Sequence, residues 1–344
     1  MKKNIFAIVS AVLLLAAASC TKEKEGVFNP SSKISAIYQD YVVYHGNELE
    51  LSVPKYQAEQ WVWIENRLEC INYFMEPYST EDTMYGPLLL WTQNFTYDNK
   101  DRLTRADVVF SDFGYLDAKD SAYNVYATYE YDGKYLKRIN VYENGILCLE
   151  YEFVHDGSTI SAITVGINGD IYDKGADKRY ARFLSRINPL RFAIAPELAE
   201  KAFSATQDCA KKIAKNGAKS VYSITFNTEW DGDNLTRLSG KMMGLIDFDF
   251  TFTYDTYKNP YYGLFDAVGS TSNATMVPYM AMGKNNITEM TMMENEMGEI
   301  YSEAASYTYT YKKSGYPETM TCEETEYDID DDLYRQVTTT YYCY

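Results

Sequence analysis

The sequence predicts a mainly β fold, an extended and twisted antiparallel meander, and three observations support this prediction. Tyrosine accounts for 34 of the 344 residues, and its ring fits the half-buried surface of a pleated strand. Asn-Gly and Asp-Gly pairs recur in the middle of the chain, where they favour two-residue hairpin turns. The segments between these turns alternate apolar and polar residues. Such a meander can curl into a partly closed cylinder, which would protect its edges.

The segment 121–173 carries this signal most clearly. Its turns are expected at Asp132-Gly133, Asn144-Gly145, Asp156-Gly157 and Asn168-Gly169. Between two of them, Leu147, Leu149, Tyr151 and Phe153 occupy alternate positions and so share one face of a strand. Because successive tight turns join antiparallel neighbours, we expect one continuous meander here.

A wider repeat accompanies the turns. An aromatic residue is followed five positions later by an aliphatic residue and, three further on, often by another. Examples are Trp63/Leu68/Ile71, Tyr131/Leu136/Ile139, Trp230/Leu235/Leu238 and, with one inserted residue, Tyr97/Leu103/Ala106. This repeat predicts a strand that ends on a buried ring, a polar turn, and a strand that restarts the core. His155 occupies such an aromatic position, with Ile160 five residues on, so packing or a turn contact is its expected role.

One segment departs from the β pattern. Pro196 to Asn216 is rich in Ala, Lys and Glu, and small and apolar residues recur along one stripe. Proline at a helix start and Gly217 just past the end are typical helix boundaries. We therefore expect one amphipathic helix at about 196–216, within a helical insertion at about 174–219.

Strands resume after this insertion. We expect them at Val221–Trp230, Leu235–Gly240, Leu245–Tyr254, Ile287–Met293, Ile300–Tyr311 and Val337–Tyr344. In the fifth of these, Tyr307, Tyr309 and Tyr311 alternate with threonines, which places three rings on one face. These tyrosines lie outside the repeat positions, so they form the candidate binding surface.

The N-terminus reads as a secretory signal. Lys2 and Lys3 precede an apolar stretch that is too short for a membrane span, and small residues then lead to Cys20. This resembles the bacterial lipobox, which implies removal of residues 1–19 and acylation of Cys20 by fatty acids such as palmitate. The alternative is a plain signal peptide with an incidental cysteine. Residues 20–32 are then a flexible tether, and 33–344 one β-rich domain or, alternatively, two β lobes.

Charge and residue types exclude several function classes. The net charge of −17 makes nucleic acid an unfavourable partner. The acidic run Asp328, Asp330, Asp331 and Asp332 lacks the glycine and glutamate of an EF-hand loop, which favours a solvated loop over a calcium site. Seven methionines between Met276 and Met297 favour core filling over copper binding. We expect no cofactor and no metal, and the five cysteines after Cys20 favour small apolar roles over disulfides.

Several short motifs resemble the tyrosine-aspartate (YD, or Rhs-type) repeat. They are Phe95-Thr96-Tyr97-Asp98, Tyr129-Glu130-Tyr131-Asp132-Gly133 and Phe252-Thr253-Tyr254-Asp255. Nearly the whole chain then resembles Bacteroidetes lipoproteins built from degenerate YD-like strands. The charged residues after Cys20 are similar to the export signal of such proteins. The resemblance implies a lipid anchor in the outer membrane and exposure at the cell surface, with a periplasm-facing lipoprotein as the alternative.

These observations together predict a non-catalytic, lipid-anchored envelope protein that binds a glycan or a protein. The resemblance supplies no catalytic residues to transfer. The alternatives are an extracytoplasmic hydrolase that uses a carboxylate pair and a structural or assembly protein of the outer membrane.

Overall fold

The computed structural model describes residues 27–75, 87–111, 124–168, 221–242, 246–265, 279–296, 299–327 and 333–344. Within these residues the chain forms sixteen strands and one 3-10 turn. They are β1 (Ala36–His45), β2 (Glu48–Ile64), β3 (Arg67–Phe74), β4 (Leu89–Tyr97), β5 (Leu103–Phe110), β6 (Val125–Asp132), β7 (Tyr135–Glu143), β8 (Ile146–Asp156), β9 (Thr159–Asn168), β10 (Val221–Asp231), β11 (Asn234–Met242), β12 (Ile246–Lys258), η4 (Tyr279–Ala281), β13 (Asn285–Glu296), β14 (Glu299–Tyr311), β15 (Pro317–Tyr327) and β16 (Leu333–Cys343).

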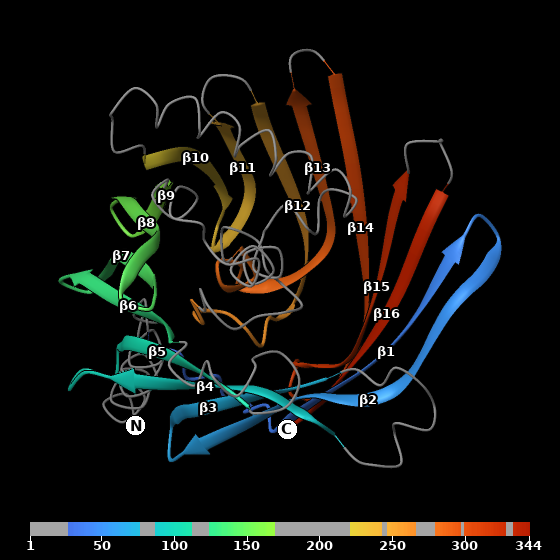
Figure 1. Ribbon diagram of the computed structural model, residues 1–344, viewed down its shortest axis with the longest axis horizontal. Coiled ribbons are helices and arrows are strands. Elements are labelled where there is room, and N and C mark those ends of the chain that lie inside the picture. Colours follow the sequence, from blue (N-terminus) through green and yellow to red (C-terminus); the bar gives the residue numbers. More distant parts are fainter. Residues whose placement is uncertain are drawn as a thin grey trace, which may run out of the picture.

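Every strand pairs antiparallel with its neighbours in sequence, and β1 also pairs with β16, so the sheet closes into a barrel (Figure 1). The predicted mainly β meander is confirmed, including the continuous run from β6 to β9. The barrel closes completely, because Ala36 pairs with Cys343 and the register continues to His45 and Tyr334. The helix expected at about 196–216 lies outside the described residues, as do the signal segment and Cys20.

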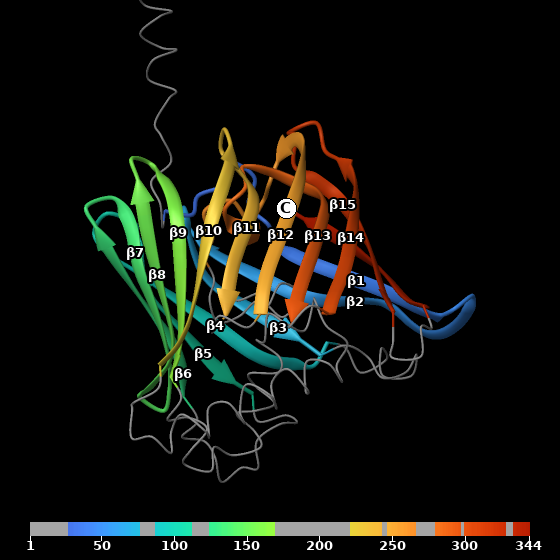
Figure 2. The ribbon, with the colours of Figure 1, turned by 90° about the horizontal axis from the view of Figure 1, so that it is seen from above.

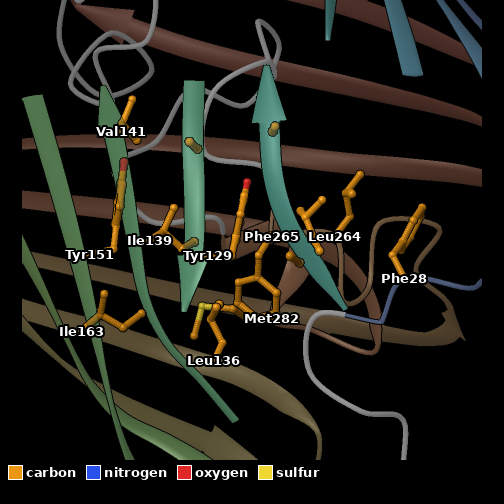
Figure 3. Packing of buried hydrophobic residues seen from close by; sticks show 14 of the residues in the cluster. Phe28, Tyr129, Leu136, Ile139, Val141, Tyr151, Ile163, Leu264, Phe265 and Met282 are labelled. Atoms are coloured by element: carbon orange, nitrogen blue, oxygen red, sulfur yellow. The ribbon is translucent and has the colours of Figure 1, made fainter. Parts of the chain in front are cut away.

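The core lies inside the barrel. One cluster of buried apolar residues includes members from every one of the sixteen strands (Figure 3). It also includes Phe28 from the N-terminal segment and Leu264, Phe265, Ala281 and Met282 from the connection between β12 and β13. The described parts of this connection, residues 259–265 and 279–284, lie in the middle of the barrel when it is viewed as in Figure 1.

Ring contacts identify the inward face of the wall. Phe265 meets Phe153 of β8 edge to face at 5.9 Å, and Tyr261 lies 6.2 Å from Trp61 of β2. Since β2 and β8 stand six strands apart, a segment of five residues contacts both only from inside the barrel. Residues that share a face with Trp61 and Phe153 therefore form the inner wall, and alternate residues form the outer wall.

Residues 259–265 and 279–284 lie together at the end of the barrel where β12 ends and β13 begins. The side-chain amide of Asn259 donates to the carbonyls of Met280 and Gly283 at 2.6 and 2.7 Å, and its oxygen accepts the Tyr261 amide at 2.9 Å. Gly283 passes so close to Tyr254 that a Cβ would lie 2.5 Å from the ring. We call this the capped end; the turns after β2, β4, β6, β8, β10 and β14 gather there as well (Figure 2).

The predicted repeat corresponds to a series of hydrogen bonds at the capped end. In each, a ring at the end of one strand donates to the carbonyl of an aliphatic residue of the preceding hairpin, or of the N-terminal segment, at 2.5 to 2.9 Å. In the described part of the chain these pairs are Trp63–Ile34, Tyr97–Leu68, Tyr131–Leu103, His155–Leu136, Trp230–Ile160, Tyr254–Leu235 and Tyr309–Ile287. The aliphatic partners are all buried, so the bonds satisfy carbonyls at the edge of the core.

Candidate binding surfaces on the barrel wall

The outer wall carries many polar side chains, alongside exposed apolar residues such as Val109, Val154 and Met293. On β6 to β8, Arg138 lies 3.3 Å from Glu130, 3.4 Å from Glu150 and 3.5 Å from Glu152. All four side chains alternate with inward residues such as Ile139 and Tyr151, so this ion-pair cluster faces away from the core.

A second part of the outer wall, four strands further around the barrel, repeats this pattern. Arg237 of β11 contacts Glu229 at 3.0 Å and Asp249 at 2.7 Å, and its hydrogen bond to Asp249 raises the pKa of the guanidinium. Threonine hydroxyls pair across neighbouring strands, Thr164 with Thr225 at 3.0 Å and Thr310 with Thr319 at 2.7 Å. The outer wall therefore carries ion pairs on β6–β8 and β10–β12, and paired hydroxyl groups on β9–β10 and β14–β15.

One part of the outer wall combines aromatic rings with charge. Tyr126 of β6 and Tyr142 of β7 stack with ring centroids 4.9 Å apart and an interplanar angle of 16°. The Arg105 guanidinium lies 3.8 Å from the centroid of the Tyr126 ring and binds both carboxylate oxygens of Asp107, at 2.6 to 2.9 Å. These hydrogen bonds raise the pKa of Arg105, so it is cationic throughout the physiological range. We call these four residues the outer aromatic patch.

The outer aromatic patch is suited to recognition. Tyrosine offers a large surface at little conformational cost, and arginine forms planar, directional hydrogen bonds. All four side chains are half-buried, so their positions are defined while part of each remains accessible. The patch is built on three neighbouring strands, which hold it in fixed register: Asp107 pairs with Tyr126, and Tyr126 with Tyr142.

A second group of rings stabilises the seam where the barrel closes. Tyr341 of β16 donates to Asp40 of β1 at 2.8 Å, and this bond raises the pKa of the phenol. The Lys55 ammonium lies 3.5 Å from the centroid of the Tyr341 ring and 5.5 Å from that of the Tyr38 ring. Because the ammonium group occupies a face of the Tyr341 ring, we interpret this group as a structural contact of the seam.

The structure places Tyr307, Tyr309 and Tyr311 on one face of β14, as the alternation predicts, and that face is the inner wall. Tyr307 packs against the core, and Tyr309 donates to the Ile287 carbonyl at 2.8 Å. Tyr311 stacks on Tyr257 at 3.8 Å and donates to the carboxylate of Asp255. Burial raises the pKa of Tyr309 and of Tyr311, so both phenols stay protonated and able to donate.

The histidine interpretation is confirmed, and the methionine interpretation is confirmed only in part, because Met293 is 48% exposed. A ring nitrogen of His155, Nε2, lies 2.8 Å from the Leu136 carbonyl, and since a carbonyl only accepts, this nitrogen carries the proton. The ring also packs on Tyr135 at 4.9 Å. Met282, Met290 and Met292 are buried in the core, as expected for core filling.

The cysteines and the acidic run are the remaining residues that the sequence analysis considered. Cys322 is a buried free thiol whose pKa is raised by burial, whereas Cys343 is exposed and so does not follow the expected apolar role. The acidic run from Asp328 to Asp332 lies outside the described residues. Among the residues that the structure does describe, His, Cys, Asp and Glu form no group of three that would hold a metal ion.

Sequence reasoning missed the outer aromatic patch. Tyr126 and Tyr142 each stand next to an inward valine, Val125 and Val141, so they occupy the polar phase of the alternation. A tyrosine in that phase, directly opposite another on the neighbouring strand, is the signal that could have identified it. This signal can be recognised only when the pairing register of β6 and β7 is known, and the turn at residues 133–134 sets that register.

Comparisons with known proteins concern the fold. No family model and no curated protein sequence matches the chain. A porin-like protein from Bacteroides uniformis is similar in structure, with a TM-score of 0.48 and 13% identity over 91% of this chain and 98% of that one. A porin-like protein from Bacteroides vulgatus gives 0.29, with 9% identity over 91% and 99%, and Pseudomonas putida OprB gives 0.26, with 6% identity over 90% and 92%. Across the described residues, no helix has the length and apolar character that a membrane crossing requires.

Proposed function

We propose that this protein is a non-catalytic, lipid-anchored protein of the outer membrane, whose barrel stands in water and binds a glycan or a protein. One observation carries the proposal: the buried apolar core lies on the inner wall, and the outer wall carries clusters of ion pairs. A barrel that crosses a membrane has the reverse pattern, with an outward apolar band about 25 Å tall and a polar interior.

The charged residues of the outer wall would make contact with lipid energetically unfavourable. An arginine on the lipid face costs about 2–4 kcal/mol at the bilayer midplane. Arg138 and Arg237 both face outward in the middle of their strands, and each is surrounded by carboxylates that water solvates well. The core cluster supports the proposal, because it places many apolar side chains inside the barrel, where they are buried without contact with lipid.

A lipid anchor at Cys20 accounts for membrane attachment without a spanning barrel. Each buried CH₂ group of an acyl chain contributes about 0.8 kcal/mol to membrane binding, so two or three chains hold a protein firmly. The anchor precedes Phe28, the first buried residue of the barrel, by eight residues. The barrel would therefore stay close to the lipid surface.

The outer aromatic patch is the binding surface that we favour. Stacked Tyr126 and Tyr142 provide ring edges and faces, and the Arg105–Asp107 pair provides hydrogen-bond donors and acceptors. Sugars and protein hot spots both use this combination. The nearby carboxylates of Glu130, Glu150 and Glu152 share Arg138, so they form an ion-pair cluster instead of a hydrolytic acid–base pair.

Attachment and solubility test the proposal directly. The lipidated chain should incorporate labelled fatty acid and pellet with the outer membrane. A chain with Cys20→Ser, behind a leader that the general signal peptidase removes, should be recovered as a monodisperse protein without detergent. If this unlipidated chain remains in the membrane and dissolves only in detergent, the barrel itself is embedded in lipid and the proposal is wrong.

A further inference from the structure

The N-terminal segment joins the barrel at its capped end. Phe28 packs against Trp61 and Trp63, with ring centroids at 6.1 and 5.7 Å. The backbone amide of Ser31 donates to the hydroxyl of Tyr316 at 3.2 Å. Phe28 lies eight positions after Cys20, a span of at most about 29 Å. An anchor at Cys20 would therefore keep the capped end, and not the opposite end, near the lipid.

Three lysines lie at this end, in or beside the turn that leads to Tyr316. The Lys258 ammonium lies 5.2 Å from the centroid of the Tyr316 ring, and that of Lys312 lies 4.4 Å from the ring of Tyr344. Lys313 is exposed in the turn between β14 and β15. Backbone hydrogen bonds fix this arrangement: the Lys258 amide donates to Gly315 and the Gly315 amide to Lys312, both at 3.0 Å. We call Lys258, Lys312 and Lys313 the lysine cluster.

The three lysines of the cluster outnumber the two carboxylates nearest to them along the chain, Asp255 and Glu318. Lys284 also lies at this end, but it is paired with Asp233 at 3.0 Å. The Asp255 carboxylate accepts hydrogen bonds from the Tyr311 hydroxyl, the Asn286 side chain and the Tyr257 amide. Glu318, at the start of β15, is the nearest exposed carboxylate along the chain. Since the whole chain carries a net charge of −17, a local positive surface decides which side can approach an anionic layer.

Exposed tyrosine adds to the lysine cluster. Tyr257 is 45% exposed and stacks on Tyr311 at 3.8 Å, beside Lys258 in the sequence. Tyrosine and lysine together are typical of surfaces at the membrane interface, where rings lie at headgroup level and ammonium groups bind phosphates.

We propose that the capped end docks on an anionic phospholipid surface through the lysine cluster and Tyr257. This inference rests on the proposed function, because the anchor at Cys20 brings the capped end to the lipid. Docking would turn the opposite end of the barrel away from the membrane. The outer aromatic patch would then stand upright on the side of the barrel, accessible to a partner in solution.

Lysine footprinting tests this orientation with the lipidated full chain. The protein is incorporated into vesicles of phosphatidylcholine with phosphatidylglycerol, or of phosphatidylcholine alone, and acetylated with an impermeant reagent. We expect several-fold slower acetylation of Lys258, Lys312 and Lys313 on the anionic vesicles only, with the difference lost in 1 M salt. Lys55 and Lys241, which face outward on the barrel wall, should react equally on both kinds of vesicle.

Two failures are distinguishable in this experiment. If the chain does not float with either vesicle, the anchor and thus the proposed function are wrong. If it floats but the lysine cluster reacts equally on both vesicles, the docking proposal is wrong while the anchor stands.

A charge-matched pair of variants tests the cluster independently of the anchor. For the unlipidated Cys20→Ser chain, Lys312→Gln/Lys313→Gln should bind anionic vesicles about thirtyfold more weakly than the parent, at about fivefold per lysine. Lys55→Gln/Lys241→Gln removes the same charge from the outer wall and should change binding less than threefold. Equal weakening by both pairs would show that net charge alone governs binding and would overturn the proposal.

Discussion

The Tyr131 hydroxyl donates a hydrogen bond to the Leu103 carbonyl at 2.9 Å. Tyr131 is the aromatic residue of one repeat, and Leu103 is the first aliphatic residue of the repeat before it. Leu103 itself follows Tyr97, whose hydroxyl donates to Leu68 of the hairpin before. Each ring thus ends one strand. The carbonyl of the aliphatic residue that follows the next turn accepts a hydrogen bond from the ring of the following hairpin. The spacing in the sequence therefore reflects how hairpins are joined to one another at the capped end.

Removal of one such hydroxyl should weaken the barrel. In Tyr131→Phe the ring still packs, but the Leu103 carbonyl at the edge of the core loses its donor, which costs about 1 kcal/mol of unfolding free energy. Urea unfolding followed by tyrosine and tryptophan fluorescence measures this loss. Tyr44→Phe, on the outer wall where the ring contacts Arg335, is the matched control and should stay within about 0.5 kcal/mol. Equal loss in both variants would contradict a special role for the ring-to-carbonyl bond.

The local pattern of the sequence predicted most of the strands but not the closure. At the predicted Asn144-Gly145 turn both residues have positive φ, 49° and 79°, as a two-residue hairpin requires. Closure depends on the pairing of Ala36 with Cys343, for which no local signal exists. The strand β15 was missed because Glu323, Glu324 and Glu326 replace the apolar residues that a core-facing strand usually shows.

The candidate site was less predictable, because alternation identifies two faces without saying which is inward. Tyr307 and Tyr309 alternate with Thr308 and Thr310, and either set fits a wet surface. The register with β13 decides the matter, since Ala305, on the same face as Tyr307, pairs with buried Met290. The strand register likewise places Tyr126 on the outer wall, although the residues around it in the sequence are no more polar than those around Tyr307.

Met292 and Met293 provide a matched test of which wall holds the core. Met292 is 1% exposed on the inner wall, whereas Met293, the next residue, is 48% exposed on the outer wall. Met292→Ala should lower the unfolding free energy by about 2–5 kcal/mol, because it leaves a cavity among buried side chains. Met293→Ala should change it by less than about 0.5 kcal/mol. Comparable losses, measured by urea unfolding, would mean that both faces of β13 are buried.

Acid should selectively remove the contribution of Asp98. Burial acts to raise the pKa of this carboxyl, but hydrogen bonds from Arg102 and Lys100 outweigh it and lower the pKa. A lowered pKa means that the carboxylate stabilises the fold above the unfolded value of about 3.9, and that this contribution is lost as pH falls below it. Asp98→Asn should therefore be less stable than the parent at pH 7, and the difference should shrink between pH 4 and about pH 2.

The control for this titration is Asp132→Asn. Asp132 follows Tyr131 as Asp98 follows Tyr97, but it is exposed, and the described part of the chain shows no comparable hydrogen bonds to it. Its replacement should leave the urea midpoint nearly unchanged at both pH values. A difference between Asp98→Asn and the parent that persists at low pH would assign the effect to the shape of the side chain, not its charge.

Ligand binding should depend on the outer aromatic patch. Tyr142→Ala removes one ring of the stacked pair, and a hot-spot ring of this kind contributes about 2 kcal/mol, or roughly thirtyfold in affinity. Glycan and peptide arrays with the unlipidated chain identify the ligand, and titration calorimetry measures the change. Tyr44→Ala removes an outward ring elsewhere and is the control. Unchanged affinity in Tyr142→Ala would place the binding surface away from this patch.

A charge placed at Met293 separates a barrel in water from a barrel in lipid. Met293 faces outward and pairs with Asp249 on β12, so an arginine there would be solvated and would gain an acidic neighbour. In water, Met293→Arg should therefore leave the unfolding free energy within about 0.5 kcal/mol of the parent. In a bilayer, the same side chain would cost about 2–4 kcal/mol near the midplane and would reduce assembly in the membrane. Normal yield and an unchanged urea midpoint for Met293→Arg support a water-exposed wall, whereas loss of the folded barrel would mean that lipid surrounds it.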